Sequence, residues 1–441
     1  MATGETKKKL GNEVKRPSSK ANSEYTYSIS YDGKKEVEDI LNTSPANVTE
    51  VWSGDSATEK DPRGSLYYGE NLPIISHLVE SGLKGKVKLI YIDPPYATNQ
   101  VFVSKNRKGG YEDLLTGAHF LEFMRERLIL LKELLAPDGS IYVHLDDNMA
   151  FEIKLLMDEI FGKKNFHNFI VRKKSNPKNY TRKQFGNVAD YVLFYSKGAN
   201  YTWNRPYDKW LPESAEKEYS YIEKETGRRF KKVPVHAPGT RNGDTGKPWK
   251  GLMPPEGKHW QYKRETLDAL DNNGLIYWSA TGNPRRKIYL DENLGIPIQD
   301  IWMDMKDAHN QNIKITGYPT EKNPDLLKRI IEASSNEDDL VLDCFAGSGT
   351  TMGAAADLSR RWIGIDSSPE AINSTLTRFL HGLKPMGDYT KNQPQTSMLP
   401  DFIGNKYLAG MKFYSESSRI KEKELQKQID ALNTFNAGLL K

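Results

Sequence analysis

The sequence predicts an α/β protein built on a doubly wound, mostly parallel β-sheet. Short apolar runs, which are typical of buried strands, alternate with longer segments whose apolar residues recur every three or four positions, as in amphipathic helices. The loops between them are short, as in strand–helix–strand units. Two of the runs end in an aspartate followed by a proline or glycine turn, at Asp93 and at Asp343. Ligands of such sheets bind at the carboxyl ends of strands, so both turns are candidate sites.

The composition fits a globular protein with a sizeable core. Its 441 residues, about three domains' worth of chain, are 37% hydrophobic and 27% charged. No apolar run approaches the ~20 residues of a membrane helix, and the polar amino terminus lacks the apolar segment of a signal peptide. The single cysteine, Cys344, excludes an intrachain disulfide and a Cys-rich zinc site. We therefore expect a cytoplasmic protein without a membrane partner. The net charge of +5 allows a nucleic-acid partner without requiring one.

The amino-terminal half predicts a basic arm followed by the first half of the sheet. Residues 1–45 are expected to form a flexible arm, because lysines and an arginine crowd its first part among small polar residues. A solvated tail and loose contact with phosphates are both consistent with this arm. Residues 46–200 contain predicted strands at 65–69, 87–92, 140–145, 168–172 and 191–196 and predicted helices at 72–83, 118–135 and 150–161.

The character of the chain changes between residues 201 and 310. Periodicity is weak there, Gly and Pro are scattered, and tryptophans alternate with basic residues. We interpret this region as an inserted, irregular domain with an aromatic and basic surface, in which several aromatics form the domain's own core. The tryptophans are Trp203, Trp210, Trp249, Trp260, Trp278 and Trp302.

The α/β pattern resumes over residues 311–385 and then stops. This region contains predicted helices at 323–334, 350–358 and 369–380 and predicted strands at 339–343 and 362–366. Residues 386–441 are expected to form a polar tail with a charged helix over 417–432. The short apolar stripe of that helix predicts docking on another element rather than a free coiled coil.

The first candidate site is the turn Asp93-Pro94-Pro95-Tyr96. Neither proline can donate to a sheet ladder, and each biases the preceding residue toward extended geometry. The turn is therefore stiff. A planar nitrogen heterocycle with an exocyclic amine would suit it, since the amino hydrogens could go to Asp93 and to a backbone carbonyl while the ring lies on Tyr96. An ordinary surface loop is the alternative.

The second candidate site is the glycine turn after Asp343. Gly347 and Gly349 let the backbone approach a ligand closely, and the following helix offers free N–H groups. Met352 stands where a dinucleotide fingerprint has its third glycine. Asp366 ends the next strand, where an acid can bind ribose hydroxyls. A ligand with a ribose, a carboxylate and a cationic centre fits this arrangement, and S-adenosylmethionine has all three.

The order of these motifs resembles that of a known family. Asp93–Tyr96, then the 201–310 insert, then Asp343–Thr351 is the order of amino-group DNA methyltransferases of the β type, and the chain is similar to type III restriction–modification methylation subunits in particular. The resemblance implies a seven-stranded, Rossmann-like methyltransferase sheet with an inserted target-recognition domain, and seven strands are predicted above. It makes 46–200 the catalytic half and 311–385 the cofactor-binding half.

The resemblance also implies partners and an origin. Double-stranded DNA is the expected substrate, with the target base flipped out of the helix, and S-adenosylmethionine is the expected cofactor. A prokaryotic or phage source, a homodimer and a cognate restriction subunit are further expectations. No metal is needed for this chemistry.

The resemblance assigns roles to the first turn and to the segment 320–322. Asp93 and the carbonyl of Pro94 bind the target amine, Pro95 completes the motif, and Tyr96 stacks on the base. Ala97 stands where Asn often follows that Tyr. The segment with Thr320 and Lys322 covers the cofactor.

The resemblance assigns the cofactor to the second turn. Asp343 lies beside the cofactor's amino group and Asp366 binds its ribose. Glu70 and Asn71 lie beside its adenine, although Glu70 replaces the usual Asp. The methionine end is lined by Phe345, Gly347 and Gly349, and the further cofactor-binding residues of this turn are Ala346, Ser348 and Thr350.

The target base and the DNA contacts follow from weaker signals. Adenine N6 is favoured over cytosine N4, because enzymes resembling the latter more often carry Ser before Pro-Pro-Tyr. Cytosine C5 would need a nucleophilic Cys, and Cys344 lies in the cofactor strand. A catalytically silent DNA-binding partner subunit and a methylase of RNA or protein amides are the alternatives. Candidate DNA contacts, with a merely solvated loop as the alternative for 173–187, are Lys173, Lys174, Lys178, Arg182, Lys183, Arg285 and Arg286.

Overall fold

The chain divides into two compact units. The computed structural model describes residues 28–57, 62–95, 117–176, 183–307, 314–315, 321–381, 384–385 and 404–439. The first unit consists of Met1–Thr202, Met303–Lys328 and Asn336–Lys441, and the second of Trp203–Trp302 and Arg329–Ser335. Among the described residues, no helix is long and apolar enough to cross a membrane.

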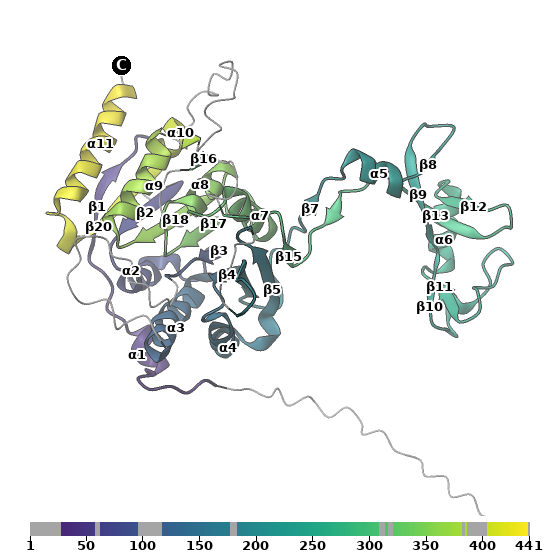
Figure 1. Cartoon of the computed structure of the whole chain (residues 1–441), viewed down its shortest axis with the longest axis horizontal. Coiled ribbons are helices and arrows are strands. Elements are labelled where there is room, and N and C mark those ends of the chain that lie inside the picture. Colours follow the sequence, from purple (N-terminus) through teal and green to yellow (C-terminus); the bar gives the residue numbers. More distant parts are fainter. Residues whose placement is uncertain are drawn as a thin grey trace, which may run out of the picture. The chain divides into compact units, whose positions relative to one another are not determined.

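The first unit is built on one mostly parallel sheet (Figure 1). The strands that belong to this unit follow the order β1-β20-β2-β18-β17-β3-β4-β6-β5. From β20 to β4 all neighbours are parallel, whereas β1, β6 and β5 each pair antiparallel with their inner neighbour. The bounds are β1 (Val48–Ser53), β2 (Gly64–Tyr68), β3 (Val87–Ile92), β4 (Leu135–Leu145), β5 (Phe166–Lys173), β6 (Ala189–Ser196), β17 (Leu340–Asp343), β18 (Arg361–Asp366) and β20 (Met411–Glu416).

All seven strands that the sequence predicts lie in this sheet, and β1 and β20 were not predicted. β20 belongs to the region expected to be a polar tail, 386–441, so that expectation was wrong for this segment. Met411, Phe413 and Ser415 are fully buried, and Phe413 pairs with Leu66 of β2. Six residues of period-two alternation, with a serine at one inward position, resemble many exposed segments. Only the neighbouring strand shows that these residues are inside.

Helices cover both faces of the sheet. α2 (Asn71–Leu78), α3 (Gly117–Leu134) and α4 (Ala150–Phe161) share a core with Ile363 and Ile365 of β18. The alternate residue Trp362 faces the other way and stacks on Phe379, with ring centroids 5.2 Å apart. Phe379 belongs to α9, so α8 and α9 cover the opposite face (Figure 1). The remaining helices of the described chain, outside 203–302, are α1 (Val37–Leu41), α7 (Pro324–Ser334), α8 (Thr350–Asp357), α9 (Pro369–His381), α10 (Gly404–Ala409) and α11 (Lys423–Leu439).

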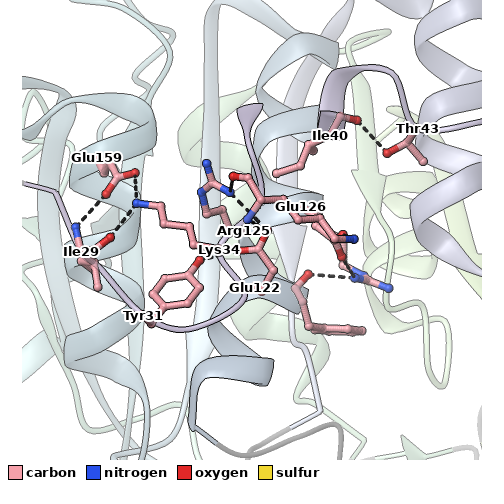
Figure 2. A network of polar contacts seen from close by, with 12 residues as sticks. Ile29, Tyr31, Lys34, Ile40, Thr43, Glu122, Arg125, Glu126 and Glu159 are labelled. Atoms are coloured by element: carbon pink, nitrogen blue, oxygen red, sulfur yellow. Dashed lines mark hydrogen bonds and ion pairs between the residues drawn. The ribbon is translucent and has the colours of Figure 1, made fainter. Parts of the chain in front are cut away.

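The second half of the predicted arm is docked on the sheet domain rather than flexible. Figure 2 shows the polar network that holds it on α3 and α4. The Ile29 N–H donates to Glu159 at 2.9 Å, and the Tyr31 hydroxyl donates to Glu122 at 2.6 Å. Lys34 forms an ion pair with Glu159 at 2.7 Å. The lysine-rich part of the arm, within 1–27, lies outside the described residues.

The carboxyl-terminal helix docks as its apolar stripe predicted, although it begins later. α11 starts at Lys423 after a single 3-10 turn, Ser417–Arg419. Leu425 and Leu432 are fully buried, and the Gln428 side-chain amide donates to the Pro369 carbonyl at 3.1 Å. A pair of short strands, β16 (Lys314–Ile315) and β19 (Lys384–Pro385), completes the described part of the first unit.

The second unit contains a four-stranded antiparallel sheet of order β12-β13-β9-β8. One core cluster is formed by buried side chains including Trp249, Trp260 and Leu267. Trp302 is also buried, so three of the six tryptophans that the sequence singled out lie inside. The sheet strands are β8 (Tyr221–Ile222), β9 (Arg229–Pro234), β12 (Ile276–Trp278) and β13 (Pro284–Tyr289). The other elements are β7 (Tyr207–Asp208), β10 (His236–Pro238), β11 (Lys258–Trp260), β14 (Ile296–Pro297), β15 (Ile301–Trp302), α5 (Pro212–Glu218) and α6 (Arg264–Asn272).

Candidate active site

Asp93 stands at the end of the central strand β3. This strand lies between β17 and β4 and is parallel to both, so Asp93 and Asp343 follow or end neighbouring strands at the same edge of the sheet. Pro94 is buried and Pro95 is exposed. The fourth residue of the predicted motif, Tyr96, lies outside the described residues.

The Asp93 carboxylate is paired with Lys322. The Lys322 Nζ lies 3.0 Å from Asp93 Oδ2, and the lysine side chain is only 10% exposed. Burial alone would lower the pKa of Lys322, but the carboxylates of Asp93 and Asp190 contribute to raising it above its ordinary value. The sequence grouped Lys322 with the cofactor contacts, and the structure places its ammonium on the first turn. Thr320 lies outside the described residues.

A buried polar network lies beneath this turn. Tyr91 precedes Asp93 by two residues, so the two side chains point to the same face of the sheet. The Tyr91 hydroxyl lies 2.7 Å from His144 Nδ1. His144 Nε2 and Arg172 Nη1 lie 3.0 and 2.9 Å from the same oxygen of Asp190. Burial alone would raise the pKa of Asp190, but His144 and Arg172 hold it well below its ordinary value. These contacts favour the ionised form of the Asp190 carboxylate, which acts on Lys322.

Asp343, at the end of β17, is held by neutral donors. It accepts hydrogen bonds from the Thr351 hydroxyl at 2.6 Å and from the Phe345 N–H at 2.9 Å. Its side chain is almost fully buried. Burial raises the pKa of Asp343 to about 7, and the nearby Asp93 carboxylate adds to the effect, against the lowering by these two donors. A cationic ligand group close to this carboxyl would favour its ionised form.

The glycine turn between β17 and α8 requires its two glycines. Gly347 and Gly349 have φ of 51° and 76°, a region that side chains other than glycine rarely adopt. A Cβ on Gly349 would also stand 2.8 Å from Thr375 Oγ1. Arg378 of α9 braces the turn: its Nε donates to the Ser348 carbonyl at 2.9 Å, and its Nη2 donates to Thr350 Oγ1 at 3.0 Å. Ala346, also predicted here, is buried.

Asp366 closes the turn from β18. It accepts hydrogen bonds from the Gly347 N–H at 2.9 Å and from the Ser368 N–H at 2.8 Å. Burial raises the pKa of Asp366 despite these two backbone donors. The structure therefore brings Asp93, Asp343 and Asp366 together as three acids at the ends of adjacent parallel strands.

Glu70 and Asn71 lie at the same edge of the sheet, after β2, but Asn71 has internal partners. Its Nδ2 donates to the Cys344 carbonyl at 2.9 Å, and its Oδ1 accepts from Arg127 Nε at 2.7 Å. Glu70 lies 3.5 Å from the guanidinium of Arg419. Asn71 thus fixes the start of the glycine turn to α3.

Comparison with known proteins defines the family at this point. A family model described as DNA methylase matches residues 87–377, which include Asp93, the insert and all of the glycine turn. The chain belongs to this DNA methylase family. As a member it acts on DNA and takes its methyl group from S-adenosylmethionine.

Curated relatives resemble this methylase over most of its length. Type II methyltransferase M.EcaI of Enterobacter cloacae is 48% identical over 363 residues, covering 82% of this chain and 79% of that protein. The Mod subunit of the type III restriction-modification enzyme StyLTI of Salmonella typhimurium is 28% identical, covering 71% of this chain and 52% of that subunit. Among solved structures, a putative DNA modification methylase of Thermus thermophilus, complexed with S-adenosyl-L-methionine, is 17% identical with a TM-score of 0.38, covering 73% of this chain and 94% of that one.

Cys344 lies in an environment typical of a core residue rather than of a nucleophile. It is fully buried, and burial raises the pKa of its thiol. Within the described part of the chain, no group of three or more His, Cys, Asp or Glu side chains could hold a metal ion.

The predicted DNA contacts fall into three groups. Lys173 and Lys174 are half-buried at the end of β5, and Lys183 is exposed. Arg285 and Arg286 are neighbours on β13 and so point to opposite faces of its sheet. Arg285 is exposed, whereas Arg286 donates to the Tyr262 hydroxyl at 2.9 Å. Lys178 and Arg182 lie outside the described residues.

Several residues of the site were not found from the sequence. Arg127, Arg378 and Glu321 support the glycine turn and its surroundings, yet each reads as an ordinary charged residue in its own segment. One usable signal was that Glu321 is adjacent to Lys322, which the sequence had already singled out. Arginines on otherwise apolar helix faces, as at positions 127 and 378, would have been a second.

Proposed function

We propose that this methylase transfers a methyl group to the N6 amine of an adenine flipped out of double-stranded DNA, with Asp93 as the acceptor that holds the amine. The observation that carries the proposal is the pairing of two acids at the ends of the adjacent parallel strands β3 and β17. Asp93 is near enough to Asp343 to raise its pKa. One acid is thus suited to a substrate amine and the other to the donor's ammonium.

The chemistry asks little of the protein beyond hydrogen bonding and position. The amine lone pair is delocalised into the adenine ring, and hydrogen bonds from its N–H groups to Asp93 and to the Pro94 carbonyl would localise it for attack on the methyl. A hydrogen bond to a charged acceptor contributes roughly 1.5–3 kcal/mol. Flipping the base costs a few kcal/mol, which stacking, the role proposed for Tyr96, partly offsets.

The residues of the second turn fit the methyl donor, which supplies an electrophilic methyl on a sulfonium. Asp343 would bind its amino group, because a buried carboxyl with a pKa of about 7 is stabilised as an anion by a cation. Asp366 would bind the ribose. The positive φ of Gly347 and Gly349 allows the close approach. Asn71, whose amide is bonded to Arg127 and Cys344, would act by shaping the turn.

The choice of adenine N6 rests on Asp93 itself. An aspartate in the first position of the motif is an anionic acceptor, and enzymes resembling cytosine-N4 methylases more often have Ser there. Expression in a methylation-free host, followed by single-molecule sequencing of its DNA, tests this directly. We expect N6-methyladenine at one recognition site, and N4-methylcytosine would overturn the assignment.

We also propose that one face of the second unit's sheet contacts DNA. Lys232 Nζ lies 3.6 and 3.4 Å from the ring centroids of Tyr221 and Tyr277, and Arg285 pairs with Tyr277 across the strands, so all four share a face. The other face carries Ile276, which packs into the core. Basic and aromatic side chains on an exposed face suit phosphates and sugar edges.

The two neighbouring arginines provide a matched test of this face. Arg285→Ala should weaken DNA binding and reduce the slope of log K against log salt by about one. Arg286→Ala, on the opposite face, should leave that slope unchanged. Fluorescence anisotropy with a labelled duplex over a salt series measures both. Equal slopes for the two variants would remove Arg285 from the DNA contacts, and the same design applies to the half-buried Lys173 and Lys174.

A restriction–modification setting is proposed from the relatives' names alone. One relative is a type II methyltransferase and another is a Mod subunit of a type III enzyme, of which this chain spans about half. Light scattering of the purified chain would report a homodimer. Affinity purification from the native host would report a restriction subunit.

A further inference from the structure

Two adjacent buried residues, Glu321 and Lys322, reach both halves of the active site. Lys322 Nζ lies 3.0 Å from Asp93 Oδ2, at the end of β3. Glu321, which is 2% exposed, forms an ion pair with Arg378. Arg378 in turn donates to the Ser348 carbonyl and to the Thr350 hydroxyl of the glycine turn. One dipeptide therefore connects the turn that presents the amine acceptor to the turn that cradles the methyl donor.

The charges around Lys322 show that the pair is built into the interior. Its ammonium faces Asp93 and Asp190, with Tyr91 also close and the Arg172 guanidinium opposing it. Asp190 is itself fixed by His144 and Arg172. A buried ammonium is strongly unfavourable without such partners, so its position is determined by the carboxylates that surround it. With Oδ2 held by Lys322, rotation of the Asp93 carboxylate is restricted.

A purely structural ion pair is the competing explanation. In that case, loss of Lys322 would lower the stability of the fold, donor binding and turnover together. A positioning role instead predicts that the methyl-transfer step alone is affected, because the carboxylate would remain present but lose its orientation. Misplacement of a reacting group by about 1 Å can slow a reaction on the order of 100-fold.

We propose that Lys322 is the residue that positions Asp93 for the target amine. Glu321, acting through Arg378, holds the glycine turn in a fixed position relative to Asp93. The inference rests on the proposed function, since it requires Asp93 to be the amine acceptor. Lys322 touches neither the methyl donor nor the base in this assignment and acts through Asp93.

Single-turnover methylation of a duplex, with donor affinity measured separately by calorimetry, tests the proposal. Lys322→Met, which keeps most of the length of the side chain without its charge, should lower the single-turnover rate on the order of 100-fold. The donor Kd of this variant should stay within about threefold of the Kd of the unmodified protein. Lys322→Arg should retain most of the single-turnover rate of the unmodified protein. Glu321→Gln should show the reverse pattern, with donor Kd raised on the order of tenfold through the loosened turn.

A double-mutant cycle separates this inference from the proposed function. In an Asp93→Asn background, Lys322→Met should cause little further loss, because both changes act on the same carboxylate. Lys322→Met at the unmodified rate, with Asp93→Asn inactive, would overturn the positioning role and leave the function standing. A fully active Asp93→Asn protein would overturn the function itself. Should Lys322→Met fail to fold, Lys322→Arg carries the test, and an arginine variant that folds and binds donor but transfers no methyl group would contradict the proposal.

Discussion

The carboxylates of Asp93 and Asp343 in the candidate active site differ in the groups that stabilise their negative charge. Asp93 and Asp343 follow or end adjacent parallel strands, β3 and β17. Asp93 has the ammonium of Lys322 at 3.0 Å. Asp343 accepts hydrogen bonds from a hydroxyl and a backbone N–H, both neutral, and its pKa is raised to about 7. The protein provides a cation for the first acid, whereas a bound ligand would provide one for the second.

This difference explains how two nearby acids can serve different partners. A carboxylate already paired with an internal cation is ready to accept a neutral amine, which brings no charge of its own. A buried carboxyl that is half protonated near neutral pH gains most from a cationic group such as an ammonium. Three predictions test the comparison, in order of expected effect.

Removal of the paired acid should have the largest effect. Asp93→Ala should reduce single-turnover methylation by on the order of 100-fold or more, since a charged acceptor contributes roughly 1.5–3 kcal/mol and the lone pair is then no longer localised. Binding of S-adenosylmethionine, measured by calorimetry, should survive. Because the change deprives the Lys322 ammonium of one of its two nearby carboxylates, Asp93→Asn, which keeps an acceptor oxygen there, serves as the matched variant. Methylation by both variants at the unmodified rate would show that this turn is not the active site.

Removal of the unpaired acid should affect the donor rather than the chemistry. Asp343→Asn keeps the shape of the side chain and should weaken donor binding roughly 10- to 150-fold, the equivalent of one charge-assisted hydrogen bond. At saturating donor the methylation rate should change little. If the rate fell while donor affinity held, the roles assigned to the two acids would have to be exchanged.

The two acids and Asp366 were predictable from the sequence for a physical reason. Each lies at the end of a short apolar run. The prolines directly after Asp93 and the glycines of the turn that follows Asp343 indicate turns that can approach a ligand closely. Local composition therefore contained most of the information. The same holds for the helices, whose apolar spacing repeats over several turns and predicted α4 at its observed bounds.

The supporting charges were not predictable, because they depend on distant partners. Arg378 lies 30 residues from Ser348 and 57 from Glu321 in sequence, and only the packing of α9 on the turn brings them together. Lys322 has a sequence position that suggested the cofactor, but its ammonium is drawn to Asp93 by charge. β20 was missed for a related reason, since six alternating residues need a partner strand to show which face is inside.

The smallest predicted effect is a pH dependence that belongs to Asp343 alone. In the folded protein its pKa is about 7, against an ordinary value of 3.8. Between about pH 4 and 7 the native state thus binds a proton that the unfolded state does not, so this group's contribution to the stability of the ligand-free protein falls as pH rises. A cationic donor selects the ionised form. Donor affinity should therefore rise about tenfold between pH 6 and pH 8, with release of a proton.

Asp343→Asn is the control for this pH dependence, because the amide cannot titrate. In that variant donor affinity should vary little between pH 6 and pH 8. As pH rises, the free energy of unfolding of the ligand-free variant should increase relative to that of the unmodified protein. Calorimetry in buffers of different ionisation enthalpy counts the released proton, and thermal unfolding follows the stability. Asp93, whose cation is internal, offers the contrasting case: Lys322→Met should leave the pH dependence of donor binding in place. A slope that persisted in Asp343→Asn would assign the titration to another acid of the turn, and Asp366, whose pKa burial also raises, would be the next to test.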